Sequence, residues 1–301
     1  MNLTVFYGAI ILGLIYGLMV LGVFLTFRIL DFPDLTVDGS ITLGAAVAAS
    51  LIVSGVNPVV ATIAAPLAGA AAGFVTGALH AKFSIPPLLA GILSMIGLYS
   101  INLRVMGRPN VPLLRESGIF DYLTAFGISP RHSAFLLSFL VVVLFCFLLH
   151  FFLNTEIGYA LRATGDNEAM VRSLGVNSGN IKILGVSLAN GLVALGGAFL
   201  AQYQGFADIS MGIGMIVAGL ASVIMGEVIL GNSSLKVRII AAIAGSIIYR
   251  SVIALVLRLG FQATDLKLFT AVIVTIALIS PSIKPSIKAY REKLNGTKSK
   301  V

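Results

Sequence analysis

The sequence predicts an all-α protein: a polytopic bundle of transmembrane helices. Hydrophobic residue types make up 58% of the 301 residues and charged types only 11%, whereas a soluble domain carries about 25% charged residues. The mean hydropathy is +1.02. The 32 glycines fit the same prediction, because small residues let helices approach closely inside a bilayer. A soluble enzyme with a membrane anchor is therefore not expected, and residues 1–301 are read as a single transmembrane domain.

Long apolar stretches give the number of expected spans. Crossing the hydrocarbon takes roughly 20 apolar residues. Nine stretches are candidates: 6–27, 37–54, 58–79, 85–103, 134–153, 181–202, 211–230, 239–257 and 266–280. The second, third and last have weak edges, and the stretch at 85–103 follows two prolines and could be broken or re-entrant. Eight spans therefore remain an alternative to nine.

The distribution of basic residues predicts the orientation. With nine spans and the C-terminus in the cytoplasm, most of the 20 Lys and Arg residues fall on the inner side, as cytoplasmic loops require. We therefore expect an outer N-terminus and a basic cytoplasmic tail at 284–301. The extracytoplasmic loop 104–133 is the exception, because it carries Arg104, Arg108, Arg115 and Arg131.

Composition also limits cofactors and partners. The net charge of +8 is explained by basic residues that hold cytoplasmic loops beside anionic lipid, so nucleic acid is not an expected partner, whereas membrane lipid is. The single cysteine, Cys146, allows no internal disulfide, and no Cys/His spacing suggests a metal. The chain lacks a phosphate-binding G-x-x-x-x-G-K-[ST] loop, so it cannot itself be an ATPase. Residues 1–26 hold no Lys or Arg, so we expect the first segment to be a retained helix and not a signal peptide.

The polar segment 154–180 predicts a short helix between two spans. Asp166 or Asn167 can cap its N-terminus. Glu168 and Arg172 have the i,i+4 spacing of a salt bridge, and Gly175 suits the C-terminal stop. Such a helix could transmit a push from a cytoplasmic motor protein to both adjoining spans. A solvated connector explains the same pattern about equally well.

This segment resembles the cytoplasmic coupling loop of ABC importer permeases. The residues depart from the maltose-type pattern E-A-A-x-x-x-G, since Met170 follows Glu168 and Ala169 and Gly175 comes one residue late. They are closer to the loop of the branched-chain amino acid and ribose permease family. The residues that this resemblance assigns to ATPase coupling are Arg162, Gly165, Asp166, Asn167, Glu168, Ala169, Arg172 and Gly175.

Three further blocks carry the resemblance over most of residues 30–280. Residues 34–45 are similar to the D-L-S-x-G-S…G-A stretch of ribose-type permeases, with Asp38 as an insertion. Blocks 86–93 and 100–108 resemble tryptophan/tyrosine-type ABC permeases.

The resemblance implies a pore-forming subunit in a bacterial inner membrane, paired with a second permease copy. It also implies an ATPase subunit that holds ATP and Mg, and an extracytoplasmic binding protein. The implied substrate is an amino acid, aromatic types included, or a similar small solute. On this view the arginines of loop 104–133 are candidates for docking the binding protein.

Candidate pathway residues include Asp34, Asp38, Gly39 and Ser40 at the start of the second span. Helix capping explains the two aspartates more simply than a substrate role. The functional reading is a broken helix at the pore, since irregular backbone at membrane depth requires protein or water to satisfy it.

Glu227 and Arg250 are charged residues inside predicted spans. Such charges are costly and usually face a bundle interior or a cavity, so we expect both to line the pore or a helix seam. They could pair, although nine spans place them roughly 12 Å apart in depth.

Two other function classes were weighed. A self-sufficient secondary transporter would be expected to show paired inverted repeats, and the sequence shows no clear internal repeat. An intramembrane enzyme would need a catalytic pair at membrane depth, and none stands out. The sequence therefore favours a permease subunit that is not itself an enzyme.

Overall fold

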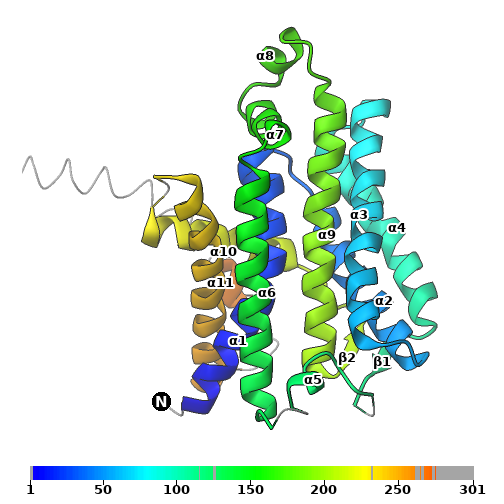
Figure 1. The fold of residues 1–301 in the computed structure, drawn as a ribbon, viewed down its shortest axis with the longest axis vertical. Coiled ribbons are helices and arrows are strands. Elements are labelled where there is room, and N and C mark those ends of the chain that lie inside the picture. The colour runs from blue at the N-terminus through cyan, green and yellow to red at the C-terminus, as the bar shows by residue number, and fades with distance from the viewer. Residues whose placement is uncertain are drawn as a thin grey trace, which may run out of the picture.

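The computed structural model describes residues 3–114, 116–124, 127–231, 233–261, 265, 268–272 and 275, and within them the fold is a bundle of helices (Figure 1). The helices and strands are α1 Leu3–Phe24, the π-helix η1 Leu25–Ile29, α2 Thr36–Val53, α3 Pro58–Phe83, α4 Pro87–Met106, β1 Asn110–Pro112, α5 Asp121–Thr124, α6 Pro130–Phe152, α7 Glu156–Asp166, α8 Glu168–Ser173, α9 Ser178–Gln204, β2 Phe206–Asp208, α10 Met215–Leu230 and α11 Leu235–Arg258. The basic tail 284–301 and most of the ninth predicted span lie outside the described residues.

Seven helices in this part of the chain are long and apolar enough to cross a bilayer. They match seven of the predicted spans to within a few residues at each end. The stretch 85–103, which we considered as a broken helix, is the continuous helix α4. The stretch 211–230 forms only the 16-residue helix α10, which is shorter than a full crossing. The protein is therefore a multi-pass membrane protein, and the exact number of crossings stays a prediction.

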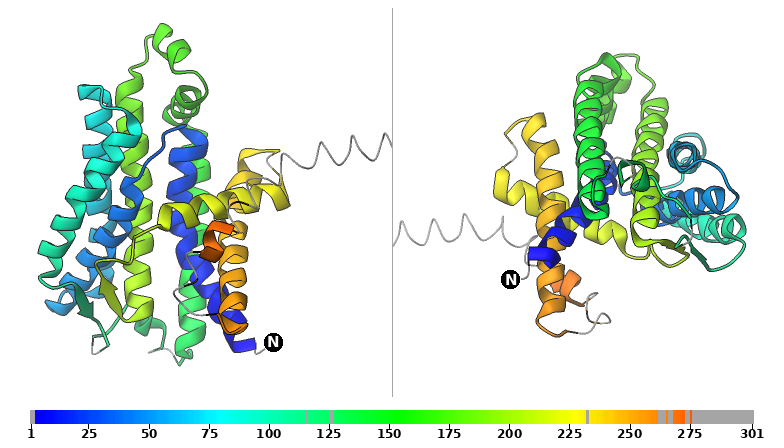
Figure 2. Two further views of the ribbon diagram at one scale, coloured as in Figure 1. Left: turned by 180° about the vertical axis from the view of Figure 1, so that it is seen from behind. Right: turned by 60° about the horizontal axis from the view of Figure 1, so that its bottom comes forward.

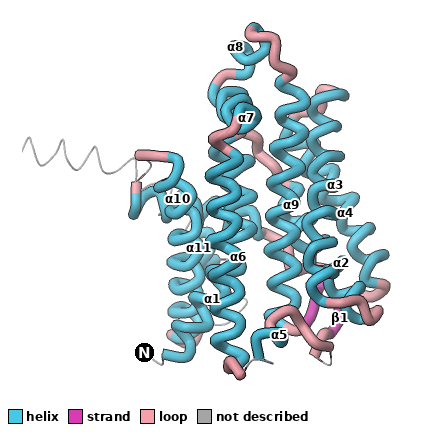
Figure 3. Tube along the Cα trace, viewed as in Figure 1, coloured by secondary structure: helices cyan, strands magenta, loops and turns pink. Residues whose placement is uncertain are grey.

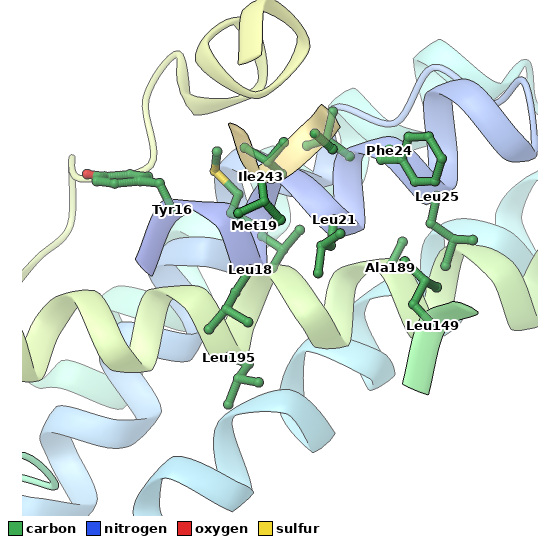
Figure 4. Packing of buried hydrophobic residues seen from close by; sticks show 14 of the residues in the cluster. Tyr16, Leu18, Met19, Leu21, Phe24, Leu25, Leu149, Ala189, Leu195 and Ile243 are labelled. Atoms are coloured by element: carbon green, nitrogen blue, oxygen red, sulfur yellow. The ribbon is translucent and has the colours of Figure 1, made fainter. Parts of the chain in front are cut away.

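Helix α1 occupies the centre of the bundle together with α9. In its most apolar 18-residue stretch 83% of the residues are buried, and in that of α9 78% are. The corresponding shares are only 22% for α4 and 17% for α6. Figure 4 shows Leu18, Leu21 and Phe24 of α1 packed among side chains from α6, α9 and α11. The exposed apolar faces of α4 and α6 are suited to lipid or to another membrane helix.

Glycines set the distance between α2 and α9. A Cβ on Gly44 of α2 would lie 1.9 Å from the Ala194 carbonyl oxygen, and a Cβ on Gly197 of α9 would lie 1.9 Å from the Ile41 carbonyl oxygen. Each helix therefore supplies a glycine where the other's backbone comes closest. The glycine-rich composition thus reflects helix packing, as expected.

Two parts of the fold resemble each other, and we interpret this likeness as an internal repeat that the sequence alone did not suggest. Helices α1 and α9 run in opposite directions along the bundle. The π-helix η1 follows α1 and the strand β2 follows α9, and after each of them the chain turns back and begins a shorter helix, α2 or α10 (Figures 1 and 2). Helix α1 packs against α11, as α9 packs against α3. At one constant offset the two halves carry Gly17 and Gly191, Leu18 and Leu192, Leu21 and Leu195, Gly22 and Gly196, Phe32 and Phe206, and Asp34 and Asp208.

The two ends of the bundle differ. One end carries α7 and α8, and the other carries α5 and the β1–β2 pair (Figure 3). Loop 104–133 holds α5 and also β1, which pairs antiparallel with β2 through Val111 opposite Ala207. This small sheet is the described exception to the all-α prediction, and it ties the loop to the end of α9.

Candidate functional site

A network of uncharged polar groups surrounds Asp34 in the middle of the fold. Asp34 is completely buried. Its Oδ1 accepts the backbone N–H of Thr36 over 2.9 Å, and its Oδ2 accepts from Asn190 Nδ2 of α9 over 2.7 Å. Ser40 donates to Asn190 Oδ1 over 2.6 Å, and the Thr36 hydroxyl lies 2.8 Å from that of Thr76. Asp34 thus accepts the first backbone N–H of α2, from one residue before the N-cap position of that helix, and also links α2 to α9.

Asp38 caps a different helix from the one that carries it. Its Oδ2 accepts from the Gly214 N–H and its Oδ1 from the Ile216 N–H, each over 2.8 Å. These groups form the N-terminus of α10, where the helix dipole favours a negative charge. Gly212 fits directly against this turn, since a Cβ there would lie 1.9 Å from the Asp38 carbonyl oxygen. The carboxylate therefore joins the two short helices of the repeat.

A cavity of about 420 Å³ borders this junction. Asp38, Gly39 and Thr42 line it from α2, and Tyr99 and Asn102 line it from α4. Asn102 is buried and donates to the Gly39 carbonyl oxygen over 3.1 Å. Three of the predicted pathway residues, Asp34, Asp38 and Ser40, are thus fixed by hydrogen bonds between helices, and Gly39 lies at the cavity wall.

Glu227 and Arg250 do not pair with each other. Glu227, with a side chain 9% exposed, forms an ion pair with Arg28 of η1, and the Nε of Arg238 lies 3.9 Å from its Oε1. The Arg250 guanidinium carbon lies 3.3 Å from the ring centroid of Tyr16, a cation–π contact. Both residues lie at seams between helices, Glu227 between α10 and η1 and Arg250 between α11 and α1.

The segment after α6 folds as two helices, where one was expected. Helix α7 precedes the predicted one, and α8 begins after Asn167, whose Oδ1 accepts the Met170 N–H over 3.0 Å. A Cβ on Gly165 of α7 would lie 2.0 Å from the Ile29 carbonyl oxygen, so α7 rests directly on η1. Gly175 has φ +83°, the left-handed conformation that glycine tolerates and that ends α8.

Glu168 makes more contacts than its predicted pair with Arg172. Its Oε1 accepts from Arg172 Nη2 over 2.6 Å and from Ser178 over 2.9 Å, and its Oε2 accepts from Lys182 Nζ over 2.7 Å. Partial burial opposes ionisation, but the hydrogen bonds from Lys182, Ser178 and Arg172 and the Lys182 charge outweigh it and lower the pKa to about 2. The carboxylate therefore stays charged at neutral pH and holds α8 against the start of α9.

Other predicted coupling residues are more exposed than Glu168. Asp166 and Ala169 are exposed. The Arg162 guanidinium carbon lies 5.5 Å from the centre of the Tyr159 ring one turn earlier. These groups present side chains outward from the end of the bundle that carries α7 and α8.

Three of the four loop arginines can be placed. Arg104 lies in the last turn of α4, Arg108 follows that helix, and Arg131 lies in the first turn of α6. All three belong to the end that carries β1, β2 and α5 (Figure 1). Arg115 lies outside the described residues.

Several site residues were missed in the sequence. Asn190, Lys182 and Ser178 all belong to α9, and Arg28 belongs to η1. Asn190 stands in an apolar stretch in which a buried amide was a detectable signal. Lys182 and Arg28 had been counted only as inner charges.

A model of one transporter family matches residues 5–279, and its description is branched-chain amino acid transport system / permease component. The chain belongs to this permease family. The permease is also 46% identical over 282 residues to the tyrosine transport system permease protein of Clostridioides difficile strain R20291, covering 94% of this chain and 93% of that protein.

More distant relatives are also permease proteins of import systems. The permease is 30% identical over 217 residues to the ribose import permease protein RbsC of Escherichia coli K12, covering 71% of this chain and 66% of that protein. It is 31% identical over 212 residues to the autoinducer 2 import system permease protein LsrC of Escherichia coli O9:H4, covering 69% and 59%. No solved structure matches the chain.

Proposed function

We propose that this permease is the pore-forming subunit of an ATP-driven importer in a bacterial inner membrane, with an ATPase subunit bound at the α7–α8 end. The observation that carries this proposal is the fixing of α8. A six-residue helix is too short to be stable alone, yet Glu168 ties it to Ser178 and Lys182 of α9 and also bonds Arg172 one turn later in α8. A short helix held by charge-assisted hydrogen bonds can serve as a rigid handle for a partner.

We extend the proposal to the remaining parts of the complex. The opposite end, with Arg104, Arg108 and Arg131, would dock acidic residues of an extracytoplasmic binding protein. Charge complementarity there would mainly raise the encounter rate and would be screened by salt. A second permease copy would complete the pore. ATP and Mg would be held by the ATPase, because this chain has no phosphate-binding loop.

The substrate we propose is tyrosine or a related aromatic amino acid. The support is the Clostridioides difficile relative, a tyrosine transport system permease protein that matches this chain along nearly its whole length. The alternative is a secondary transporter, which the internal repeat alone would also suit.

Reconstitution tests the proposal. The permease, its ATPase and its binding protein are placed in liposomes that contain ATP, with the binding protein on the outside, and uptake of radiolabelled tyrosine is followed. We expect uptake that requires all three proteins and persists after ionophores collapse every ion gradient. Uptake by the permease alone, driven by a gradient, would instead show a secondary transporter. Competition by phenylalanine, tryptophan, leucine and ribose then defines the substrate class.

A further inference from the structure

The contacts of Glu168 continue beyond α9 to a third helix. Lys182 Nζ, which binds Glu168 on one side, also lies 3.2 Å from Nε2 of His80 near the end of α3. The Lys182 side chain is only 13% exposed, so its ammonium group is held between these two partners. Helix α8 is thereby connected to α3, which is not adjacent to it in sequence.

The His80 ring makes two further contacts, one with the turn between α3 and α4 and one with the segment before α2. Its Nδ1 lies 2.9 Å from the carbonyl oxygen of Ile85, in the turn that joins α3 to α4. The ring also makes a T-shaped contact with the ring of Phe32, with the centroids 5.3 Å apart. Phe32 is buried and precedes Asp34 by two residues in the segment that leads into α2.

The chemistry of the neighbours fixes the state of His80. A carbonyl oxygen only accepts hydrogen bonds and an ammonium group only donates them. The arrangement that satisfies both neighbours has His80 donating from Nδ1 to the Ile85 carbonyl oxygen and accepting at Nε2 from Lys182. In this state the ring joins two groups that have no direct contact.

We propose that Glu168, Lys182 and His80 form a relay that transmits movement of α8 to the α3–α4 turn and to the segment before α2. This inference rests on the proposed ATP-driven function. Helix α8 is joined in sequence only to α7 and α9, so without the relay its movement would reach other helices only through the packing of these two. With it, the same displacement reaches Ile85 and Phe32, which lead into α4 and α2, the helices that line the cavity beside Asp38. His80 and Lys182 are positioning residues in this scheme.

The experiment compares transport with ATP hydrolysis in the complete reconstituted complex. His80→Phe keeps an aromatic edge for Phe32 and removes both hydrogen bonds. Lys182→Met removes the central charge. We expect both variants to hydrolyse ATP but to import about tenfold less substrate per ATP, which corresponds to about 1.4 kcal/mol of lost coupling. His80→Gln, whose amide can both donate and accept, should restore much of the wild-type ratio.

Lys82→Met is the matched control. Lys82 lies on the same helix two residues after His80, is exposed, and forms no ion pair in the described part of the chain. Losing this charge should leave the import ratio unchanged. Size-exclusion chromatography establishes that each variant remains assembled with the ATPase.

The outcomes separate the relay from the proposed function. A wild-type complex that shows no ATP-dependent uptake contradicts the function itself. A functional wild type with unaltered import per ATP in His80→Phe and Lys182→Met overturns the relay. Loss of coupling in His80→Gln with normal coupling in His80→Phe also overturns it, because aromatic packing on Phe32 would then be the important contact.

Discussion

At the scale of single residues, acidic side chains in this protein join helices. Asp34 links α2 to α9 through Asn190, Asp38 links α2 to α10, and Glu168 links α8 to α9. A carboxylate is costly inside a membrane protein unless hydrogen bonds satisfy it. Each of these three accepts hydrogen bonds on both oxygens. Each carboxylate therefore helps to position the helices that it joins.

Replacing Asp38 should loosen α10. Asp38→Ala leaves the N–H groups of Gly214 and Ile216 without their acceptor, and losing such a cap costs about 1–2 kcal/mol. Asp38→Asn keeps one oxygen and should lose less. We expect both variants to unfold at a lower temperature in detergent and to show faster hydrogen exchange in the first turn of α10. Both effects should be larger for Asp38→Ala than for Asp38→Asn.

Asp166→Ala is the control for this measurement. Asp166 is an exposed aspartate whose side chain makes no hydrogen bond within the described residues. Its loss should leave the unfolding temperature near that of the wild type. If Asp38→Ala behaved like Asp166→Ala, the cap on α10 would not contribute to stability.

At the scale of elements, the sequence predicted the long helices well and the connections between them poorly. Runs of apolar residues located seven spans because hydrocarbon length fixes how many such residues are needed. Helix α10 was overestimated, since the turn at 209–214 is composed largely of Gly, Ile and Met and is as apolar as a span. The pairing of β1 with β2 was not predicted, because three-residue strands distant in sequence leave no periodic signal.

In the candidate site, too, the sequence predicted the local features and missed the contacts between helices. Local features of α8 were predictable from spacing: the Asn167 cap, the pair of Glu168 with Arg172, and the stop at Gly175. The partners Lys182 and Asn190 were not, because they approach only when α9 packs against the other helices. Likewise, the capping of α10 by Asp38 of α2 requires the tertiary fold.

The α8 segment allows a test of coupling. Glu168→Ala removes the acceptor shared by Arg172, Ser178 and Lys182, and Gly175→Leu introduces a side chain at φ +83°, where left-handed backbone costs about 1–2 kcal/mol. Both variants should insert and assemble but show weaker ATPase binding or about tenfold less uptake, matching roughly 1.4 kcal/mol. ATPase affinity and liposome uptake measure the two effects.

Gly127→Leu is the matched control for Gly175→Leu. Gly127 has the same φ of +83° and equally open surroundings, but it belongs to the loop at the opposite end of the bundle. Strain alone would affect both variants alike. Full uptake in Glu168→Ala and Gly175→Leu would mean that residues 154–180 only connect two spans.

At the scale of the whole molecule, the repeat relates the two halves of the bundle. The corresponding residues Asp34 and Asp208 make the same local turn, each accepting at Oδ1 a backbone N–H two residues later over 2.9 Å. One lies buried at the start of α2 and the other at the end that carries the small sheet. The lack of a clear repeat in the sequence was one argument against a secondary transporter, and the likeness of the two halves gives that argument less weight. Membership of the permease family now favours an importer subunit.

Charge also separates the ends of the molecule, and this predicts its orientation. Arg28, Lys82, Arg162 and Arg172 lie towards the α7–α8 end, and the long helices put Arg104, Arg108 and Arg131 at the other. Cytoplasmic segments are enriched in Lys and Arg, and the tail 284–301 adds more of these residues to the predicted inner side. We therefore expect the α7–α8 end in the cytoplasm and the N-terminus outside.

Two isosteric substitutions test this orientation. Ser117 and Ser173 are both exposed, one in the loop before α5 and one at the end of α8, and each is changed to Cys in a Cys146→Ser background. A membrane-impermeant maleimide applied to intact spheroplasts should label position 117 and not 173, because it reaches only the outer face. After permeabilisation both should react, which shows that the protected thiol is accessible in the folded protein. Labelling of 173 but not 117 in intact spheroplasts would invert the topology and place α8 beyond the reach of a cytoplasmic ATPase.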